Sequence, residues 1–291
     1  MVDCAVAEGW SDMTGSQDVV KAKALLRGLV QAELEEVPQD FAVEAGAAAA
    51  THLKSLRRLW KESEIVVAFA SFGSEMSTDA VIEAALSDGK VVVLPRVMNG
   101  GLSFHRIDSL SYASDTHRYG MREPAETLAG FDPIATAAGG RRVLVICPGL
   151  AFDRSGRRLG RGKGYYDRFI AALRHAARVP RPVPGSSEIA LTSYAASETN
   201  EDGQAEATGT AGDNAAGDNA AGDVEASGID RSLGRNQNPK TGAYTQPVEP
   251  RWNSVVVCAF AYSSQIVWHV PAGATDEPVD LIVTNERVVL R

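Results

Sequence analysis

The chain has 291 residues, of which 44% are hydrophobic and 23% charged. These values are near globular averages and exclude wholesale disorder, a collagen-like fibre and a small disulfide scaffold. The net charge of −8 argues against nonspecific binding to nucleic acid or to an anionic membrane surface, because both need clustered lysine and arginine.

The N-terminal residues 1–15 are expected to form a flexible tail. They lack the basic and apolar regions of a signal peptide, and no run of about 18 apolar residues predicts a transmembrane helix anywhere. The three cysteines lie far apart, without the CxxC spacing of a zinc site. We therefore expect reduced thiols in a cytoplasmic protein.

Four amphipathic helices are predicted from apolar periodicity and capping residues. The first begins near Ser16, and the second covers about 42–60. The third runs from its N-cap Thr78 to Leu86, and the fourth covers about 164–177.

Short apolar runs rich in β-branched residues predict strands that are buried on both faces. The predicted strands lie at 65–70, 91–94, 143–146, 254–261, 280–284 and 287–290, and a half-exposed strand lies at 102–107. Strands that alternate with helices predict an α/β fold with a mainly parallel sheet. Ligands of such folds bind beyond the carboxyl ends of the strands.

Residues 185–249 differ from the rest in composition. They contain the repeat AGDNAAGDNAAGD and few large apolar side chains, too few to offset the entropy of ordering. We expect a disordered acidic insertion in a single domain over 16–291. It holds 11 acidic and 3 basic residues, so it carries the whole net charge of −8. The remainder is neutral, with basic residues concentrated at 154–168.

A glycine-rich segment follows the buried strand 143–146. Gly160, Gly162 and Gly164 alternate with Arg161 and Lys163 just before a predicted helix. Glycines let a backbone approach a ligand closely, and the N–H groups at a helix start attract anions. The spacing is not that of a Walker loop. The segment favours phosphate binding, with a solvated glycine-rich connector as the alternative.

The segment PGLAFDRSGRRLGRGKGYYDRF resembles the signature of the 5-formyltetrahydrofolate cyclo-ligase family. Further matches follow in order: KALLR at 23–27, FASFGSEMSTDAVI at 69–82, VLPRV at 93–97, YGMREP at 119–124 and CAFAYSSQIVWHVPAGATDEPVD at 258–280. The resemblance covers about 17–178 and 252–290. It implies a three-layer αβα fold of the NagB/RpiA/CoA-transferase-like type.

The resemblance also implies an ATP- and Mg²⁺-dependent ligase of one-carbon metabolism. Such an enzyme closes 5-formyltetrahydrofolate to 5,10-methenyltetrahydrofolate and releases ADP and phosphate. A monomer that acts on a small-molecule, possibly polyglutamylated substrate, without nucleic acid or membrane, is expected. The alternatives are a non-catalytic nucleotide- or RNA-binding relative and an enzyme that phosphorylates another small amide.

Motif matches imply roles for individual residues. The ATP site would hold Lys23, Arg27, Arg158, Gly160, Arg161, Gly162, Lys163, Gly164 and Tyr166, with Arg161, Lys163 and Tyr165 catalytic. The folate site would hold Phe72, Glu75, Met76, Tyr119 and Tyr165, and Mg²⁺ would bind Asp167 and Asp276. From the residues alone, Lys23 and Arg27 are surface charges. For four other residues an alternative stands beside the role that the resemblance implies: a solvated loop carboxylate for Glu75, a packing aromatic for Tyr166, a first-turn helix charge for Asp167 and an ordinary turn residue for Asp276.

Some positions depart from the family pattern. Arg122 stands where relatives often have proline, a change at the expected folate wall, and Ala274–Thr275 replaces a frequent Glu-His pair. Arg96 either is structural or lines the site, and Gln265 matches a recurrent position without a derivable role.

Overall fold

A computed structural model describes residues 16–98, 100–112, 115–116, 122–179, 236–237, 244–245 and 251–291. The predicted tail, Tyr119 and nearly all of the predicted insertion lie outside these residues. Within 185–249, only strands β9 (Asn236–Gln237) and β10 (Tyr244–Thr245) are described, and they pair antiparallel. The described residues up to 179 and from 251 onward belong to one compact unit.

The centre of this unit is a seven-stranded sheet in the order β14-β13-β11-β6-β1-β2-β3. The internal pairs are parallel, and the outer pairs β2–β3 and β13–β14 are antiparallel. The strands are β1 (Ile65–Val67), β2 (Val91–Met98), β3 (Gly101–Ile107), β6 (Val143–Cys147), β11 (Val255–Ala261), β13 (Leu281–Thr284) and β14 (Val288–Leu290). The mainly parallel sheet predicted from the sequence is confirmed.

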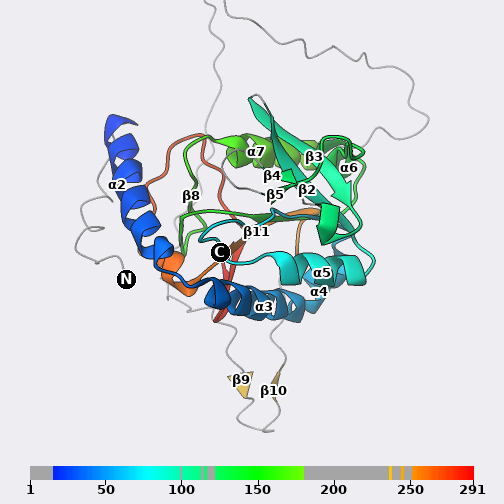
Figure 1. Ribbon diagram of the computed structural model, residues 1–291, viewed down its shortest axis with the longest axis horizontal. Coiled ribbons are helices and arrows are strands. Elements are labelled where there is room, and N and C mark those ends of the chain that lie inside the picture. The colour runs from blue at the N-terminus through cyan, green and yellow to red at the C-terminus, as the bar shows by residue number, and fades with distance from the viewer. Residues whose placement is uncertain are drawn as a thin grey trace, which may run out of the picture. The chain divides into compact units, whose positions relative to one another are not determined.

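Helices cover both faces of the sheet (Figure 1). Helices α3 (Gln39–Ser55), α4 (Arg57–Glu62) and α5 (Asp79–Ser87) lie on one face, and α6 (Pro133–Ala138) and α7 (Tyr165–Arg178) lie on the other. Strand residues alternate between the two cores that result. Leu144 and Ile146 face the α3–α5 layer, and Val143 and Val145 face the α6–α7 layer.

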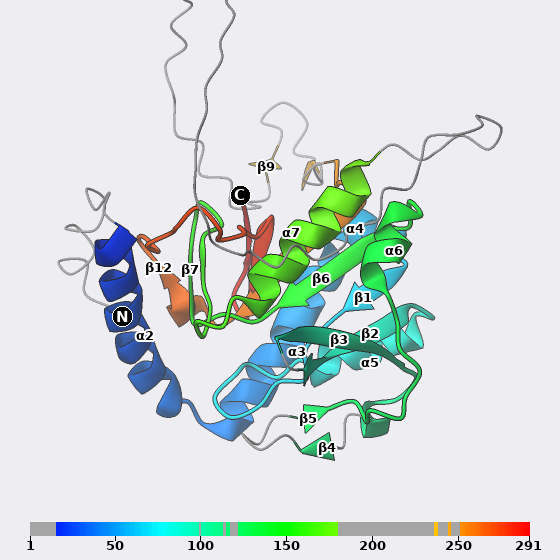
Figure 2. The ribbon, with the colours of Figure 1, turned by 90° about the horizontal axis from the view of Figure 1, so that it is seen from above.

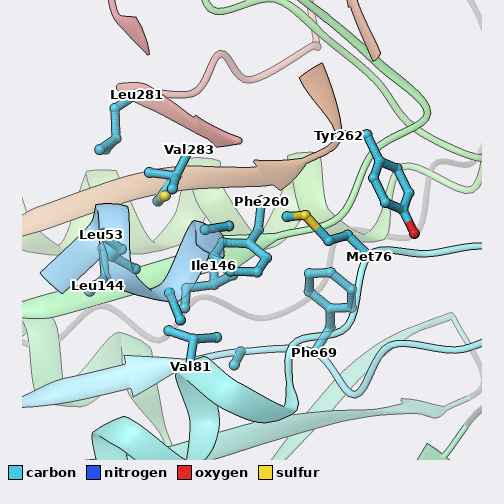
Figure 3. Packing of buried hydrophobic residues seen from close by; sticks show 14 of the residues in the cluster. Leu53, Phe69, Met76, Val81, Leu144, Ile146, Phe260, Tyr262, Leu281 and Val283 are labelled. Atoms are coloured by element: carbon cyan, nitrogen blue, oxygen red, sulfur yellow. The ribbon is translucent and has the colours of Figure 1, made fainter. Parts of the chain in front are cut away.

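The core under α3 and α5 is built from side chains of many elements (Figure 3). Leu53 of α3 and Val81 of α5 pack with Leu144 and Ile146 of β6, and all four are fully buried. Further along the same face lie Phe69, Met76 and Phe260, at the end of the sheet to which the strands β1 and β11 point. Apolar packing therefore continues to the region where ligands of such folds bind.

Helix α2 (Ser16–Glu35) confirms the predicted first helix and stands at the side of the sheet (Figure 2). Its buried stripe consists of Ala22, Leu26, Val30 and Leu34, four residues apart. This spacing puts one face of the helix on the unit. Among the described residues no helix is long and apolar enough to cross a membrane.

Three predicted elements differ clearly in extent. The strand predicted at 91–94 continues to Met98 as β2. The helix predicted at 42–60 is two helices, because Leu56 between them has a non-helical ψ of 71°. The break turns Leu59 and Trp60 of α4 into the core. The strand predicted at 65–70 ends at Val67, although residues 68–70 remain buried.

The predicted side-chain cap at Thr78 is wrong. Thr78 precedes α5, but it makes no side-chain cap. Its hydroxyl donates to the carbonyl of Phe69 at 2.6 Å and accepts from the N–H of Ser71 at 3.1 Å. The hydroxyl of Thr78 thus stabilises the loop before α5 and does not cap the helix.

Several short elements were not predicted. Helix α6 is capped at its N-terminus by Asp132, the residue before it. The Oδ1 of Asp132 accepts from the N–H groups of Ile134 and Ala135 at 2.9 Å each. The start of the glycine-rich segment is a hairpin of β7 (Ala151–Asp153) and β8 (Arg158–Leu159), to which β12 (Ile266–Val267) adds a third strand. Only the start of the segment is therefore a small sheet, and residues 160–164, which hold the alternating glycines, form the loop that leads to α7. Strands β4 (Asp115–Thr116) and β5 (Arg122–Glu123) form another short pair.

Candidate functional site

The buried carboxylate of Asp153 fixes the turn between β7 and β8. Its Oδ1 accepts from the N–H groups of Ser155 at 2.9 Å and Arg157 at 3.1 Å. Its Oδ2 accepts from the N–H of Val270 at 2.9 Å, in the segment that leads to Asp276. One carboxylate thus joins the glycine-rich segment to a part of the chain more than a hundred residues away.

The residues between β8 and α7 present basic side chains on an unusual backbone. Gly162 and Gly164 have φ of 98° and 65°, the left-handed region that glycine tolerates. Arg161 and Lys163 beside them are exposed. Gly164, the residue before α7, has no side chain that could accept hydrogen bonds from the N–H groups of the first turn. Such a helix start attracts anions.

Helix α2 brings two further cations to this segment. Arg27 donates from Nε to the carbonyl of Gly160 at 2.9 Å. Lys23, one turn earlier, donates from Nζ to Oδ2 of Asp276, and its side chain is only 16% exposed. Lys23 and Arg27 are therefore half-buried side chains bonded to the segments that carry the other motifs, and their interpretation as free surface charges is wrong.

The two predicted metal ligands lie in one neighbourhood. Asp167 Oδ1 accepts from Arg158 Nη2 at 2.7 Å and from the N–H of Glu277 at 3.2 Å, and Glu277 directly follows Asp276. Asp276 Oδ2 also accepts from the N–H of Gly273 at 2.6 Å. In the part of the chain that the structure describes, no three His, Cys, Asp or Glu residues gather as a metal site.

A small pocket, partly open to solvent, adjoins the glycine-rich segment. It is lined by Leu34, Phe69, Glu75, Met76, Pro148, Gly149, Leu150, Arg161, Phe260 and Gln265. Its exposed lining is about equally polar and apolar, with a carboxylate, a guanidinium and an amide among the polar groups. It combines apolar side chains with polar groups that can fix the orientation of a small organic ligand.

Glu75 is the acidic group of the pocket and is only 14% exposed. Its Oε1 accepts from Arg161 Nη2 at 3.1 Å, and its Oε2 accepts from the N–H of Phe72 at 3.3 Å. The Arg161 guanidinium also lies 5.1 Å from the centre of the Phe72 ring. Burial raises the pKa of Glu75, although Arg161 opposes the shift. The interpretation of Glu75 as a solvated carboxylate is therefore wrong.

The sequence profile of the 5-formyltetrahydrofolate cyclo-ligase family matches residues 19–186, more than half of the chain. The chain belongs to this family. A probable 5-formyltetrahydrofolate cyclo-ligase of Caenorhabditis elegans is 30% identical over 143 residues, which are 47% of this chain and 67% of the relative. The corresponding protein of Mycolicibacterium smegmatis is 32% identical over 165 residues, covering 54% and 77%. The mouse protein is matched over 55% of its length.

A solved structure supports the fold of this cyclo-ligase. The 5,10-methenyltetrahydrofolate synthetase of Aquifex aeolicus superposes with a TM-score of 0.54 at 20% identity and covers 92% of each chain. At this identity the likeness concerns the fold alone.

One residue that lines the pocket has a structural role that the sequence did not reveal. Gln265 donates from Nε2 to the carbonyls of Gly149 and Leu150 at 2.9 and 3.0 Å, and its Oε1 accepts from the N–H of Tyr262 at 2.8 Å. It ties the end of β11 to the entrance of the glycine-rich segment. The only sign of this role in the sequence was that Gln265 matches a recurrent position of the family.

The remaining predicted residues lie around the two parts of the site. Tyr166 packs on the α7 core, and its buried hydroxyl has no hydrogen-bond partner among the described residues, so its surroundings favour packing. The half-buried Tyr165 lies under Arg168, with the guanidinium carbon 5.4 Å from the ring centre. Arg96 donates to the carbonyl of Pro124 at 2.9 Å. Tyr119 lies outside the described residues.

Replacing Glu75 by glutamine is expected to make stability less sensitive to pH. Because the pKa of Glu75 is raised above its ordinary value of 4.5, the folded state keeps a proton that the unfolded chain releases. Stability therefore falls as pH rises from about 4.5 through the raised pKa. Urea unfolding at a series of pH values should show the difference between Glu75→Gln and wild type growing in favour of the variant as pH rises through this window. A difference that shrinks would contradict the prediction.

Proposed function

We propose that the protein uses ATP to cyclise 5-formyltetrahydrofolate to 5,10-methenyltetrahydrofolate, with release of ADP and phosphate. Beyond family membership, one observation carries the proposal. The ion pair between Arg161 and Glu75 joins a basic glycine-rich segment to a pocket that combines apolar and polar side chains. Direct transfer of a phosphoryl group between two substrates requires adjoining sites of these two kinds.

The reaction balances in two steps. The formyl oxygen attacks the γ-phosphorus of ATP, the bond to the bridging oxygen breaks and ADP leaves. The N10 amine then attacks the formyl carbon and loses its proton to the solvent, the ring closes and the oxygen departs as part of phosphate. Phosphorylation is needed because an unmodified formamide oxygen is a poor leaving group. The contribution of the protein is positioning and positive charge at the transferring group.

The cations of the glycine-rich segment and of α2 suit the phosphates. Arg161 and Lys163 are exposed beside the left-handed glycines, and Arg27 holds the carbonyl of Gly160. In this proposal the ATP site consists of Lys23, Arg27, Arg158, Gly160, Arg161, Gly162, Lys163, Gly164 and Tyr166. Arg161 and Lys163 neutralise charge on the phosphoryl group, and Tyr165 acts near the formyl group.

The pocket around Glu75 suits the folate. A pterin ring offers amide and amino donors, and a buried carboxylate accepts from both. Met76 lines the pocket and is buried, and the half-buried Phe72 lies beside it with its ring under the Arg161 guanidinium. Tyr119 and Tyr165 complete the proposed folate site.

Asp167 and Asp276 fit a magnesium ion of the kind that ATP brings. Mg²⁺ prefers oxygen ligands and takes one or two protein carboxylates, with phosphate and water for the rest. The two aspartates already have cationic partners, Arg158 and Lys23. When bound, the ion would neutralise phosphate charge.

The proposal extends to organisation and setting. We place a single catalytic domain over 16–291, of the NagB/RpiA/CoA-transferase-like type and interrupted by 185–249. The protein would act as a monomer in the cytoplasm. The folate could carry a polyglutamate tail.

The test is turnover by the purified full chain. With ATP, Mg²⁺ and 5-formyltetrahydrofolate, we expect absorbance of the methenyl product to rise, and omission of ATP to abolish the rise. Binding of ATP without product would favour a non-catalytic nucleotide-binding relative. Phosphate release with another small amide but not with this folate would show that the proposed substrate is wrong.

A further inference from the structure

The loop that carries Glu75 is closed at its base by paired hydrogen bonds. The N–H of Ser71 donates to Oγ1 of Thr78 at 3.1 Å, and the N–H of Thr78 donates to Oγ of Ser71 at 3.2 Å. Inside, the N–H of Glu75 donates to the carbonyl of Phe72 at 3.2 Å. The position of Glu75 therefore depends on where this base, residues 71 and 78–79, is held.

Arg122 of β5 donates hydrogen bonds to both sides of that base. Its Nη2 donates to Oδ1 of Asp79 at 2.5 Å, and its Nη1 donates to Oδ2 of the same carboxylate at 3.3 Å. The Nη2 also contacts the carbonyl oxygen of Ser71 at 3.4 Å. The planar fork of a guanidinium is suited to such a two-point contact, which a lysine ammonium would not reproduce.

The next residue anchors Arg122 to the central sheet. The side chain of Glu123 is 5% exposed, and its Oε1 accepts from the N–H of Val97 in β2 at 3.0 Å. Its Oε2 lies 3.8 Å from Nη1 of Arg96. Neighbouring residues of β5 thus face opposite ways, one toward the sheet and one toward the Glu75 loop. The strand links the two.

We propose that Arg122 is a positioning residue for Glu75 and thereby for the folate substrate. The inference rests on the proposed function, because Glu75 is assigned there to the folate. Arg122 contacts Asp79 and Ser71 and not the pocket lining. It therefore acts through the loop. Its removal loosens the loop and weakens substrate binding, while Lys23, Arg27 and Arg158 of the ATP site keep contacts that do not involve this loop.

The decisive comparison is Arg122→Gln against wild type. The Michaelis constant for 5-formyltetrahydrofolate should rise about five-fold, a size typical of one partly exposed ion pair. The turnover number and the Michaelis constant for ATP should stay within about two-fold. Asp79→Asn should give the same pattern, and the double variant should add little to either single change. The Michaelis constant of Arg122→Lys for 5-formyltetrahydrofolate should lie between those of Arg122→Gln and the wild type.

The matched control is Arg106→Gln. Arg106 of β3 pairs with Asp108 through Nε and Nη2 at 3.2 and 3.0 Å, and both side chains are more exposed than Arg122 and Asp79. This variant removes an arginine–aspartate pair far from the Glu75 loop in the chain. It should leave all three kinetic constants unchanged.

A readout without substrate separates this inference from the proposed function. Amide hydrogen exchange of residues 71–79 should become several-fold faster in Arg122→Gln and Asp79→Asn, and stay unchanged in Arg106→Gln. If the wild type fails to turn over folate, the proposed function is wrong. Amide hydrogen exchange still tests whether Arg122 holds the base of the Glu75 loop. Unchanged exchange together with an unchanged folate constant, or an equal rise in the ATP constant, overturns the role of Arg122. Should Arg122→Gln unfold, Arg122→Lys and Asp79→Asn decide by the same measurements.

Discussion

Replacing Lys163 by alanine is expected to lower kcat/KM for ATP by about 10²–10³-fold, the usual loss when a preorganised charge at a reacting group is removed. Lys163 is exposed between Gly162 and Gly164, whose left-handed backbone the substitution does not touch. The change therefore deletes a cation and leaves the segment in place. Steady-state kinetics with ATP and folate varied in turn provides the measurement.

Folate binding supplies the contrast for this variant. The affinity of Lys163→Ala for 5-formyltetrahydrofolate, measured by calorimetry without ATP, should match wild type, because Lys163 does not line the Glu75 pocket. Lys61→Ala, at an exposed position of α4, should leave both properties unchanged. Equal losses of ATP use and folate affinity would contradict the assignment of Lys163 to the phosphates.

Replacing Gly46 by alanine is expected to destabilise the protein by about 2–4 kcal/mol, since overpacking against a rigid neighbour is costly. A Cβ at Gly46 in α3 would lie 2.0 Å from the carbonyl oxygen of Ser77. The N–H of Ser77 donates to the carbonyl of Ala42 in the same helix, so the two segments cannot separate freely. Thermal unfolding should show a drop of about 5–15 °C.

The same substitution at Gly28 should have the opposite sign. Gly28 lies in α2, and no atom lies within 4 Å of a Cβ built there. Alanine is the better helix former, by about 0.8–1 kcal/mol. Gly28→Ala should therefore raise the melting temperature by a few degrees. A melting temperature of Gly46→Ala equal to or above that of the wild type would contradict the packing of α3 on the loop before α5.

The central strands were predictable because their signal is local. Runs such as Val143–Cys147 are apolar at every position, which fits strands covered on both faces. The break at Leu56 was not predictable, because the 42–60 pattern is helical throughout and only packing places Trp60 in the core. The β7–β8 hairpin was missed for a related reason. Its turn is held by the buried Asp153, whose second oxygen bonds Val270, 117 residues away.

The site was predictable as a set of motifs and not as a set of contacts. The glycine-rich segment and Glu75 stand out in the sequence, but nothing in it pairs Arg161 with Glu75. The contact between Lys23 and Asp276 joins residues 253 positions apart. Arg122 was visible only as a departure from the family pattern. Its contacts with Asp79 and Ser71 give that departure a structural meaning.

The strand order has a consequence for synthesis on the ribosome. Strand β6 pairs on one side with β1 and on the other with β11, where Cys147 lies opposite Ala259, 112 residues later. At about 5–20 residues per second, the nascent chain waits on the order of 5–20 s before that partner emerges. During this interval the β3-β2-β1-β6 half of the sheet has a fully apolar open edge. Such an edge invites pairing with other chains, so we expect the growing polypeptide to depend on chaperones until β11 has been made.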